Sequence, residues 1–155
     1  MDNAPDTNEP LPEGVDPIQV ATVLASLLDA DDFASVAKML SDDVEYRIGD
    51  AAHQGPDAVA ASYREGSALA RRIFEEVEYS HEIIGLVGER TVRIEYADNL
   101  SANGFHIEHH SIHDVEVGHD GRIVTITDQP VADQQERIAA FLARHGLTRD
   151  ESPSS

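Results

Sequence analysis

Apolar residues recur at helical spacing in the first third of the chain. Asp16-Pro17 predicts a helix start, because proline is favoured at the first helical position. The spacing that follows predicts a helix through Ile18, Val20, Ala21, Val23, Leu24, Leu27 and Leu28. A second short helix is expected from Phe33 to Leu40, and 44–48 alternates like a strand. The segment Gln54-Gly55-Pro56-Asp57 is typical of the start of a third helix.

From Ile73 onward the apolar period changes to two, which predicts strands. A turn at 87–90, an Asn-Gly step within 99–104 and a second hairpin signal at 119–121 separate four of them. Residues 131–144 are expected to form a terminal amphipathic helix that stops at Gly146. The predicted fold class is α+β, with a curved antiparallel sheet packed as a cone against N-terminal helices. Such a cone has an open mouth, where a ligand can bind.

Composition limits the partners and the organisation of the chain. Its 155 residues predict one domain over 16–146, with a disordered lead-in at 1–15 and a flexible tail at 147–155. The formal net charge of -19 disfavours nucleic acid and anionic lipid as partners. There is no cysteine, no secretory signal and no apolar stretch of membrane-spanning length. We therefore expect a soluble, cytoplasmic protein without a membrane partner.

The longest predicted strand, 105–117, carries polar residues on its core-facing side. Val115 and Val117 should face the core, and period two then places His113, Ser111 and His109 on that side with them. Buried polar groups need partners, which a cavity with water or ligand supplies. The alternative is a bulge before Ser111 that reverses the faces and leaves the histidines in solvent.

The histidines of this strand also raise the question of a metal. On a helix they would form one stripe with ligand spacing, consisting of His106, His109, His110 and His113. On a strand, His109 and His113 lie roughly 13 Å apart, while the other two face the opposite way. The hairpin signals on both sides favour the strand. We therefore predict no metal site and no cofactor.

Arg93, Glu95 and Asp128 form a second group of candidate residues. Asp128 shares a strand face with Ile126 and Val124, and a carboxylate among apolar side chains suits general acid or base work. Arg93 and Glu95 share one face of their own strand. The alternative is that Val92, Ile94 and Tyr96 form the core face, with Arg93 and Glu95 as a solvated pair. Asp128 could likewise cap the last helix or belong to the Asp-Gln-Pro turn, and Tyr46 could be a core aromatic.

The element order, the helix start GPDAV and the final hairpin DGRIVTITD resemble the nuclear transport factor 2-like superfamily, and within it the SnoaL-like domains. The resemblance covers about residues 17–144. It implies a cone-shaped fold, small-molecule chemistry and a homodimer. The outer sheet face, with Val92, Ile94 and Ile112 on it, would form the dimer contact.

Tyr46, Arg93, Glu95 and Asp128 also fall at spacings similar to the catalytic groups of limonene epoxide hydrolases. By this resemblance Asp128 activates water, Glu95 protonates the epoxide, Arg93 bridges the two acids and Tyr46 holds the water. Three departures stand against it. Ile48 occupies the place of an asparagine, the middle acid is Glu rather than Asp, and the chain has no tryptophan.

These observations predict a cofactor-independent acid/base enzyme that acts on a small, largely apolar molecule. The reaction would be an epoxide hydrolysis, cyclisation, isomerisation or dehydration. The alternative is a non-catalytic module of the same fold that binds a ligand or forms a dimer. The catalytic candidates are Asp128, Arg93, Glu95 and Tyr46. The ligand-binding candidates are His109, Ser111, His113, Ile48, Val115 and Ile126.

Overall fold

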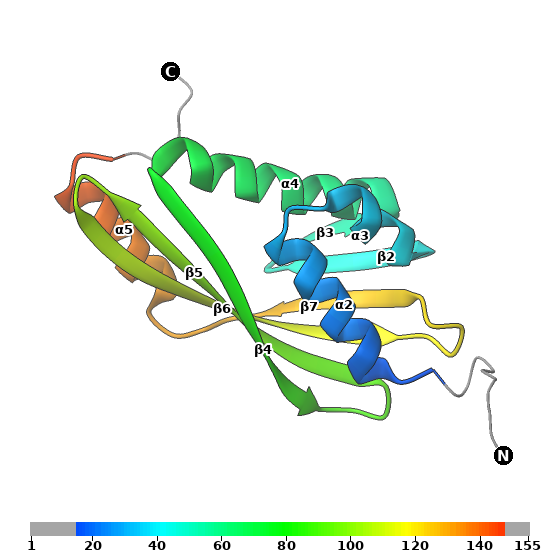
Figure 1. The fold of residues 1–155 in the computed structure, drawn as a ribbon. Helices are drawn as coiled ribbons and strands as arrows, with labels where there is room; N and C mark the ends of the chain where they lie inside the picture. Colours follow the sequence, from blue (N-terminus) through cyan, green and yellow to red (C-terminus); the bar gives the residue numbers. More distant parts are fainter. Residues whose placement is uncertain (1–14, 148–155) are drawn as a thin grey trace, which may run out of the picture.

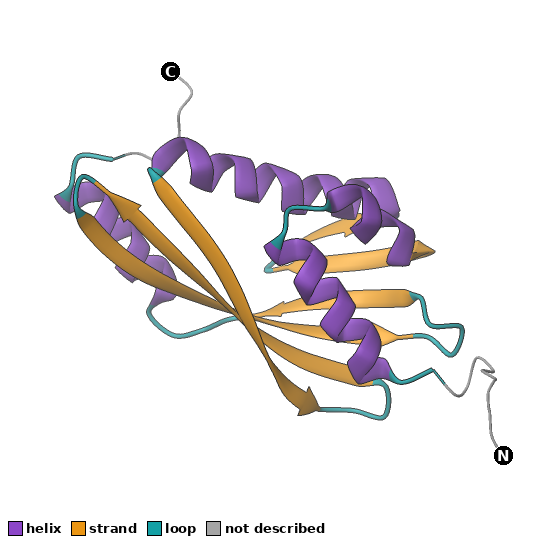
Figure 2. Ribbon diagram, viewed as in Figure 1, coloured by secondary structure: helices purple, strands orange, loops and turns teal. Residues whose placement is uncertain are grey.

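The computed structural model describes residues 15–147, so the expectations for 1–14 and 148–155 lie outside the described part. It confirms the α+β class: helices pack on a curved, unclosed sheet of six strands (Figures 1 and 2). In chain order the elements are α2 (Pro17–Asp29), α3 (Phe33–Met39), β2 (Leu40–Ile48), β3 (Ala51–Gln54), α4 (Pro56–Ile73), β4 (Glu76–Leu86), β5 (Thr91–Ala102), β6 (Phe105–Val117), β7 (Ile123–Gln129) and α5 (Gln134–Arg144).

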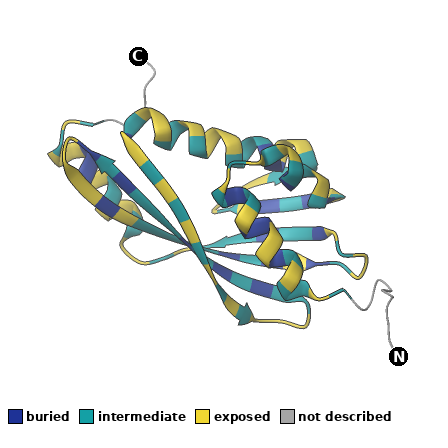
Figure 3. Ribbon diagram, viewed as in Figure 1, coloured by how far each residue is buried: buried dark blue, intermediate teal, exposed yellow. Residues whose placement is uncertain are grey.

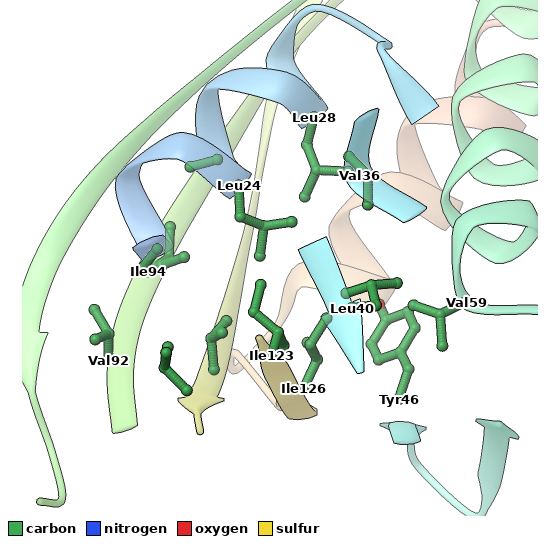
Figure 4. Close-up of a cluster of buried hydrophobic side chains, with 14 of the residues drawn as sticks. Leu24, Leu28, Val36, Leu40, Tyr46, Val59, Val92, Ile94, Ile123 and Ile126 are labelled. Carbon is green, nitrogen blue, oxygen red and sulfur yellow. The ribbon is translucent and has the colours of Figure 1, made fainter. Parts of the chain in front are cut away.

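Helix α2 begins where the sequence predicts. The Asp16 carboxylate accepts a hydrogen bond from the backbone N–H of Ile18 at 3.0 Å, and Pro17 opens the first turn. This cap satisfies one of the N–H groups that a helix start leaves unpaired. The apolar stripe of the helix packs onto the sheet through Ala21, Leu24, Ala25 and Leu28, of which Leu24 and Leu28 are seen in Figure 4.

Helix α4 is amphipathic and lies along the same side of the sheet as α2 (Figure 1). It starts after Gly55, whose φ of +91° is a conformation that glycine adopts readily. Val59 and Ala60 are buried, whereas the outer side of the helix is exposed in Figure 3. None of the helices among residues 15–147 is both long and apolar enough to cross a membrane.

The sheet runs in the order β3-β2-β7-β6-β5-β4. Strands β4 to β7 form the antiparallel meander that the hairpin signals predict. Two features have no counterpart in the prediction: the short strand β3, which pairs with β2, and the parallel pairing of β2 with β7. The parallel pair aligns Tyr46 with Ile126, so the first and last parts of the domain meet in the middle of the sheet.

The core lies between the helices and the inner face of the sheet. In β5 the buried positions alternate, and Val92 and Ile94 are 0% exposed. Figure 4 shows these two side chains with Leu24 in the core. The expectation that Val92 and Ile94 form an outer dimer face is therefore wrong, because the inner face of β5 lies under α2. Of those three residues only Ile112 lies on the outer face. Formation of a homodimer stays a prediction, which light scattering can test.

The burial pattern of β5 predicts a large difference between two neighbouring substitutions. Ile94→Ala should lower the free energy of unfolding by about 2–5 kcal/mol, since it leaves a cavity in the core. Arg93→Ala removes an ion pair on the outer face and should lower the free energy of unfolding much less. Urea denaturation of both variants measures the difference. Equal losses would contradict the assignment of the two faces.

Helix α5 covers the part of β6 that extends beyond β7. The Gln134 side-chain oxygen accepts from the His110 N–H at 2.8 Å, and the Arg137 guanidinium donates to the Glu108 carbonyl at 3.1 Å. These side chains take the place of a neighbouring strand. Below them Phe141 and Leu142 pack in a second apolar cluster, which Leu147 extends, so packing continues one residue into the predicted tail.

Candidate functional site

A cavity of about 450 Å³ lies between the inner face of the sheet and helices α2 to α4. Its volume is in the range of small-molecule sites. Apolar and aromatic residues form much of the wall, and polar groups from five strands and two helices converge on it. The lining comprises Leu28, Asp29, Asp31, Phe33, Tyr46, Ile48, Ser62, Tyr63, Gly66, Ser67, Ala70, Tyr79, Tyr96, Asp98, His109, Ser111, His113 and Asp128.

Strand β6 supplies one wall with its inner face. It pairs with β5 without a register shift, so no bulge reverses its faces. His109, Ser111 and His113 line the cavity, as the period of two predicts. His106 and His110 lie on the other face, where their side chains contact Asn99 and Glu95. The strand rather than the helical arrangement of the four histidines is thus confirmed.

His113 is the centre of a polar cluster in the deep part of the cavity. Its Nε2 lies 3.3 Å from the Tyr46 hydroxyl and 3.3 Å from Oδ1 of Asp128. Its Nδ1 lies 3.3 Å from the Tyr63 hydroxyl. The rings of Tyr46 and Tyr63 stack with centroids 5.0 Å apart. Both imidazole nitrogens thus have partners, which compensates for the burial of a polar side chain that is only 7% exposed.

The Asp128 carboxylate differs from His113 in its exposure. Its side chain is 29% exposed and lines the cavity, so a bound molecule can reach it. It stands opposite His113 in the pairing of β6 with β7. His113 can donate from Nε2 to one carboxylate oxygen, which fixes the orientation of Asp128. The cluster therefore combines an accessible carboxylate with a buried residue that positions it.

The tyrosines around the cavity remain protonated at neutral pH. Burial raises the pKa of Tyr46 well above its usual value, and the charge of Asp128 raises it further. Burial is also the largest cause that raises the pKa of Tyr63 and of Tyr96. A phenol with a raised pKa is a hydrogen-bond donor over the whole physiological range. The deep part of the cavity therefore holds donor hydroxyls close to an accepting carboxylate.

Arg93 and Glu95 do not reach this cavity, which corrects their prediction as catalytic residues. Arg93 forms two hydrogen bonds of 2.8 and 2.9 Å with Asp114 on the outer face of the sheet. Gln129 also donates to Asp114, at 3.0 Å. Glu95 lies 3.2 Å from Nδ1 of His110 on the same face. The alternation of β5 decides their position, because the inward positions are taken by the apolar side chains next to them.

The remaining candidates divide between the cavity and the core. Tyr46, Ile48, His109, Ser111, His113 and Asp128 line the cavity. Val115 and Ile126 are 0% exposed and belong to the apolar core beside it. Their predicted ligand contact is corrected, since α2 and its core neighbours cover this end of the inner face.

Several residues that line the cavity were not among the site residues predicted from the sequence. Tyr63 follows Val59 by four positions and therefore shares its inward side of α4, a signal that could have found it. Tyr79 shares a strand face with Val77, a second available signal. Asp29 and Asp31, at the end of α2 and just after it, gave no such signal.

A second polar group lies towards the α2 side of the cavity. His81 Nδ1 is 2.7 Å from Oδ2 of Asp29. Ser67 donates to Asp31 at 2.9 Å and shares a hydrogen bond of 2.9 Å with the Tyr79 hydroxyl. Arg71 forms an ion pair with Asp31 at 3.0 Å. The cavity thus has polar groups on two separate walls.

The charge of the lining favours neutral or cationic ligands. Four aspartates line the cavity, namely Asp29, Asp31, Asp98 and Asp128, while none of the described lining residues is a lysine or arginine. A carboxylate ligand would meet like charges in this cavity, and such a juxtaposition is unfavourable. Among residues 15–147, no group of three or more histidines and carboxylates has an arrangement that could hold a metal ion.

Comparison with known proteins identifies the fold. No family model matches the chain, and no curated protein matches it. Among solved structures, it is similar to an LEH-like epoxide hydrolase from M. tuberculosis, with 22% identity, a TM-score of 0.59 and coverage of 82% of this chain and 92% of the other. An NTF2-like protein of unknown function from Exiguobacterium sp. 255-15 gives 17% identity, a TM-score of 0.57 and coverage of 73% and 98%.

A third similar structure is that of SalBIII, an epoxide hydrolase/cyclase-like enzyme in pyran ring formation in polyether salinomycin. It has 10% identity, a TM-score of 0.60 and coverage of 76% of this chain and 92% of the other. At these identities the likenesses concern the fold alone. They confirm the NTF2-like fold that the element order suggests.

Proposed function

We propose that this chain is an acid/base enzyme that removes a proton from the carbon next to a carbonyl group of a small, largely apolar molecule. The carbanion formed in this way is an enolate, the shared intermediate of many isomerisations, cyclisations and dehydrations. The observation that carries the proposal is the accessible Asp128 carboxylate, held by buried His113 beside protonated tyrosines. The side chains of the protein supply both the base and the hydrogen-bond donors, so the proposed step needs no cofactor.

Asp128 is the base of this proposal. One of its oxygens faces His113 at 3.3 Å, and its side chain is exposed to the cavity. Proton transfer to a positioned side chain accelerates such a step by about 10²–10⁴-fold. His113 is a positioning residue, because its 7% exposed side chain is surrounded by Tyr46, Tyr63 and Asp128.

Tyr46 supplies a donor for the negative charge that develops on the carbonyl oxygen, while the Tyr63 hydroxyl donates to Nδ1 of His113. Their hydroxyls belong to the same cluster as Asp128, and their raised pKa keeps the protons on the phenols. Donors that are already oriented before the reaction stabilise an oxyanion more than mobile water does. His109, Ser111 and Ile48 would contact the rest of the substrate along the cavity wall.

Epoxide hydrolysis receives less support than enolate chemistry. Arg93 and Glu95 are two of the four residues whose spacing resembles the catalytic groups of limonene epoxide hydrolases. Both lie on the outer face, where Arg93 pairs with Asp114 and Glu95 with His110. Without them, the cavity lacks the acid that the resemblance assigns to the epoxide oxygen. Styrene oxide is therefore the comparison substrate in the assay below.

The test is hydrogen exchange at carbon. The ketone 4-phenylbutan-2-one is incubated with the protein in D₂O, and proton NMR follows the loss of signal from the protons next to its carbonyl. These protons should exchange for deuterium faster with the protein than in buffer alone. Buffer-level exchange together with hydrolysis of styrene oxide would replace the proposal by epoxide hydrolysis. If the ketone binds without exchange and the epoxide is left intact, the protein is a ligand-binding module.

A further inference from the structure

We propose that Asp29, held by His81, is a second catalytic group of this cavity, and that it protonates a hydroxyl leaving group. The substrate class is then a β-hydroxy ketone or aldehyde, and the overall reaction is its dehydration. This inference rests on the proposed function, since it takes the enolate formed at Asp128 as its starting point. It adds the leaving group and the acid that the first step does not require.

The Asp29–His81 pair has the geometry of a proton carrier. The 2.7 Å separation between Nδ1 and Oδ2 is that of a well-formed, charge-assisted hydrogen bond between an imidazole and a carboxylate. Both side chains are largely buried, with exposures of 19% for His81 and 22% for Asp29. Asp29 lines the cavity, and His81 is not among the described residues that do. A proton on His81 can therefore reach the cavity through Asp29.

The pair lies on a different wall from the base. Asp29 ends α2 and His81 belongs to β4, whereas Asp128 and His113 belong to β7 and β6. Tyr96 lies between the two groups. It is aligned with His81 in the pairing of β4 with β5, and its ring meets that of His113 edge-on with centroids 5.1 Å apart. A substrate in the cavity can thus face a base on one side and an acid on the other.

The proposed step is balanced without a co-reactant. Asp128 takes the proton from the carbon next to the carbonyl, and the electron pair of that C–H bond enters the enolate. The enolate then expels the hydroxyl from the neighbouring carbon, and the C–O bond breaks as the C=C bond forms. A proton from the Asp29–His81 pair joins the departing oxygen, so that water leaves. The proton on Asp128 returns to the pair through solvent, which restores the enzyme.

The polar surroundings of the pair allow it to hold a leaving hydroxyl. Asp31, Ser67 and Tyr79 form a connected hydrogen-bonded group that lines the same side of the cavity. Arg71 pairs with Asp31 and carries its guanidinium 5.3 Å from the Tyr79 ring centroid. This arrangement compensates for the charge of Asp31. A hydroxyl on the substrate can therefore reach Asp29 in a polar region, while apolar residues surround the carbon skeleton.

Two probes separate the acid from the base. The first is 4-phenylbutan-2-one, which has no leaving group, so its hydrogen exchange reports the base alone. The second is 4-hydroxy-4-phenylbutan-2-one, whose dehydration produces a conjugated ketone that is followed by its ultraviolet absorbance. The variants are Asp29→Asn and His81→Gln. Asp42→Asn is the matched control, because Asp42 is an exposed residue of β2 that is not among the described residues lining the cavity.

Asp29→Asn should slow dehydration by about 100-fold or more and leave exchange within about threefold of the unmodified protein. His81→Gln keeps a hydrogen bond to Asp29 but carries no transferable proton, so it should slow dehydration by about tenfold and spare exchange. A purely structural role would lower both reactions together. The control variant should match the unmodified protein in both.

Three results would overturn the inference. Asp29→Asn could dehydrate the hydroxy ketone at the original rate. It could lose exchange and dehydration equally while its thermal unfolding is unchanged. The unmodified protein could exchange the ketone and fail to dehydrate the hydroxy ketone, in which case the proposed function stands without the acid. Absence of both reactions would instead refute the proposed function, and the inference with it.

Discussion

Replacement of Asp128 by asparagine is expected to lower exchange at the carbon next to the carbonyl by about 10²–10⁴-fold. Asparagine keeps the shape of the side chain and can still accept a hydrogen bond from His113, but its amide is no base. The carboxylate is 29% exposed and stands at the end of a paired strand, so the fold should persist. The measurement is the NMR exchange rate of 4-phenylbutan-2-one, with circular dichroism to verify folding.

Asp114→Asn is the matched control for this substitution. Asp114 follows His113 in β6 and pairs with Thr127, next to Asp128, but its side chain lies on the outer face with Arg93. The control changes one charge at the same level of the sheet without touching the cavity. It should retain the exchange activity. A comparable loss in both variants would assign the effect to the sheet rather than to the base.

Loss of stability at alkaline pH is the second large effect that the structure predicts. The pKa values of Tyr46, Tyr63 and Tyr96 are raised, with burial as the largest cause in each. The folded protein therefore holds these protons more tightly than the unfolded chain, whose tyrosines ionise near a pKa of about 10. The stabilisation is complete below that pH. It falls above it by about 1.4 kcal/mol per pH unit for each tyrosine, since only the unfolded state releases the proton.

Absorbance of the phenolate measures this effect directly. The chain contains four tyrosines and no tryptophan, so the near-ultraviolet signal comes from the tyrosines. Three of them should stay un-ionised past about pH 11 and then titrate together with unfolding. Urea denaturation at neutral and alkaline pH gives the matching change in stability. A gradual titration of three tyrosines near pH 10 in the folded protein would contradict the buried cluster.

The sequence correctly predicts that His109, Ser111 and His113 face the cavity, because apolar residues of β6 itself identify its inner face. Val115 and Val117 define the inner face, and the alternation continues unbroken to His109. The same reasoning applied to β5 indicates Val92, Ile94 and Tyr96 as the core face, which is what the structure has. The similar spacing of catalytic groups in limonene epoxide hydrolases instead favoured a cavity-facing position for Arg93 and Glu95. Local alternation was thus the better guide to where Arg93 and Glu95 point.

Other parts of the site depend on packing between distant segments. The parallel pairing of β2 with β7 leaves no mark in either strand, and this pairing brings Tyr46 near Asp128. Asp29 could be assigned to the cavity only after the angle of α2 over the sheet was known, since its position at the end of a helix is compatible with full exposure. Helix propensity and strand period give no information on either point.

The pairing of β2 with β7 also has a consequence for the order of folding. Tyr46 and His113, which meet in the site, are 67 residues apart in the chain, and β7 follows later still. Contacts across so long a loop form late, because the entropy lost on closing the loop is compensated only once they are made. During synthesis, β2 and β3 cannot join the rest of the sheet until β7 has been made, because β7 lies between β2 and β6. The site is thus assembled among the late events of folding, after β7 has been synthesised.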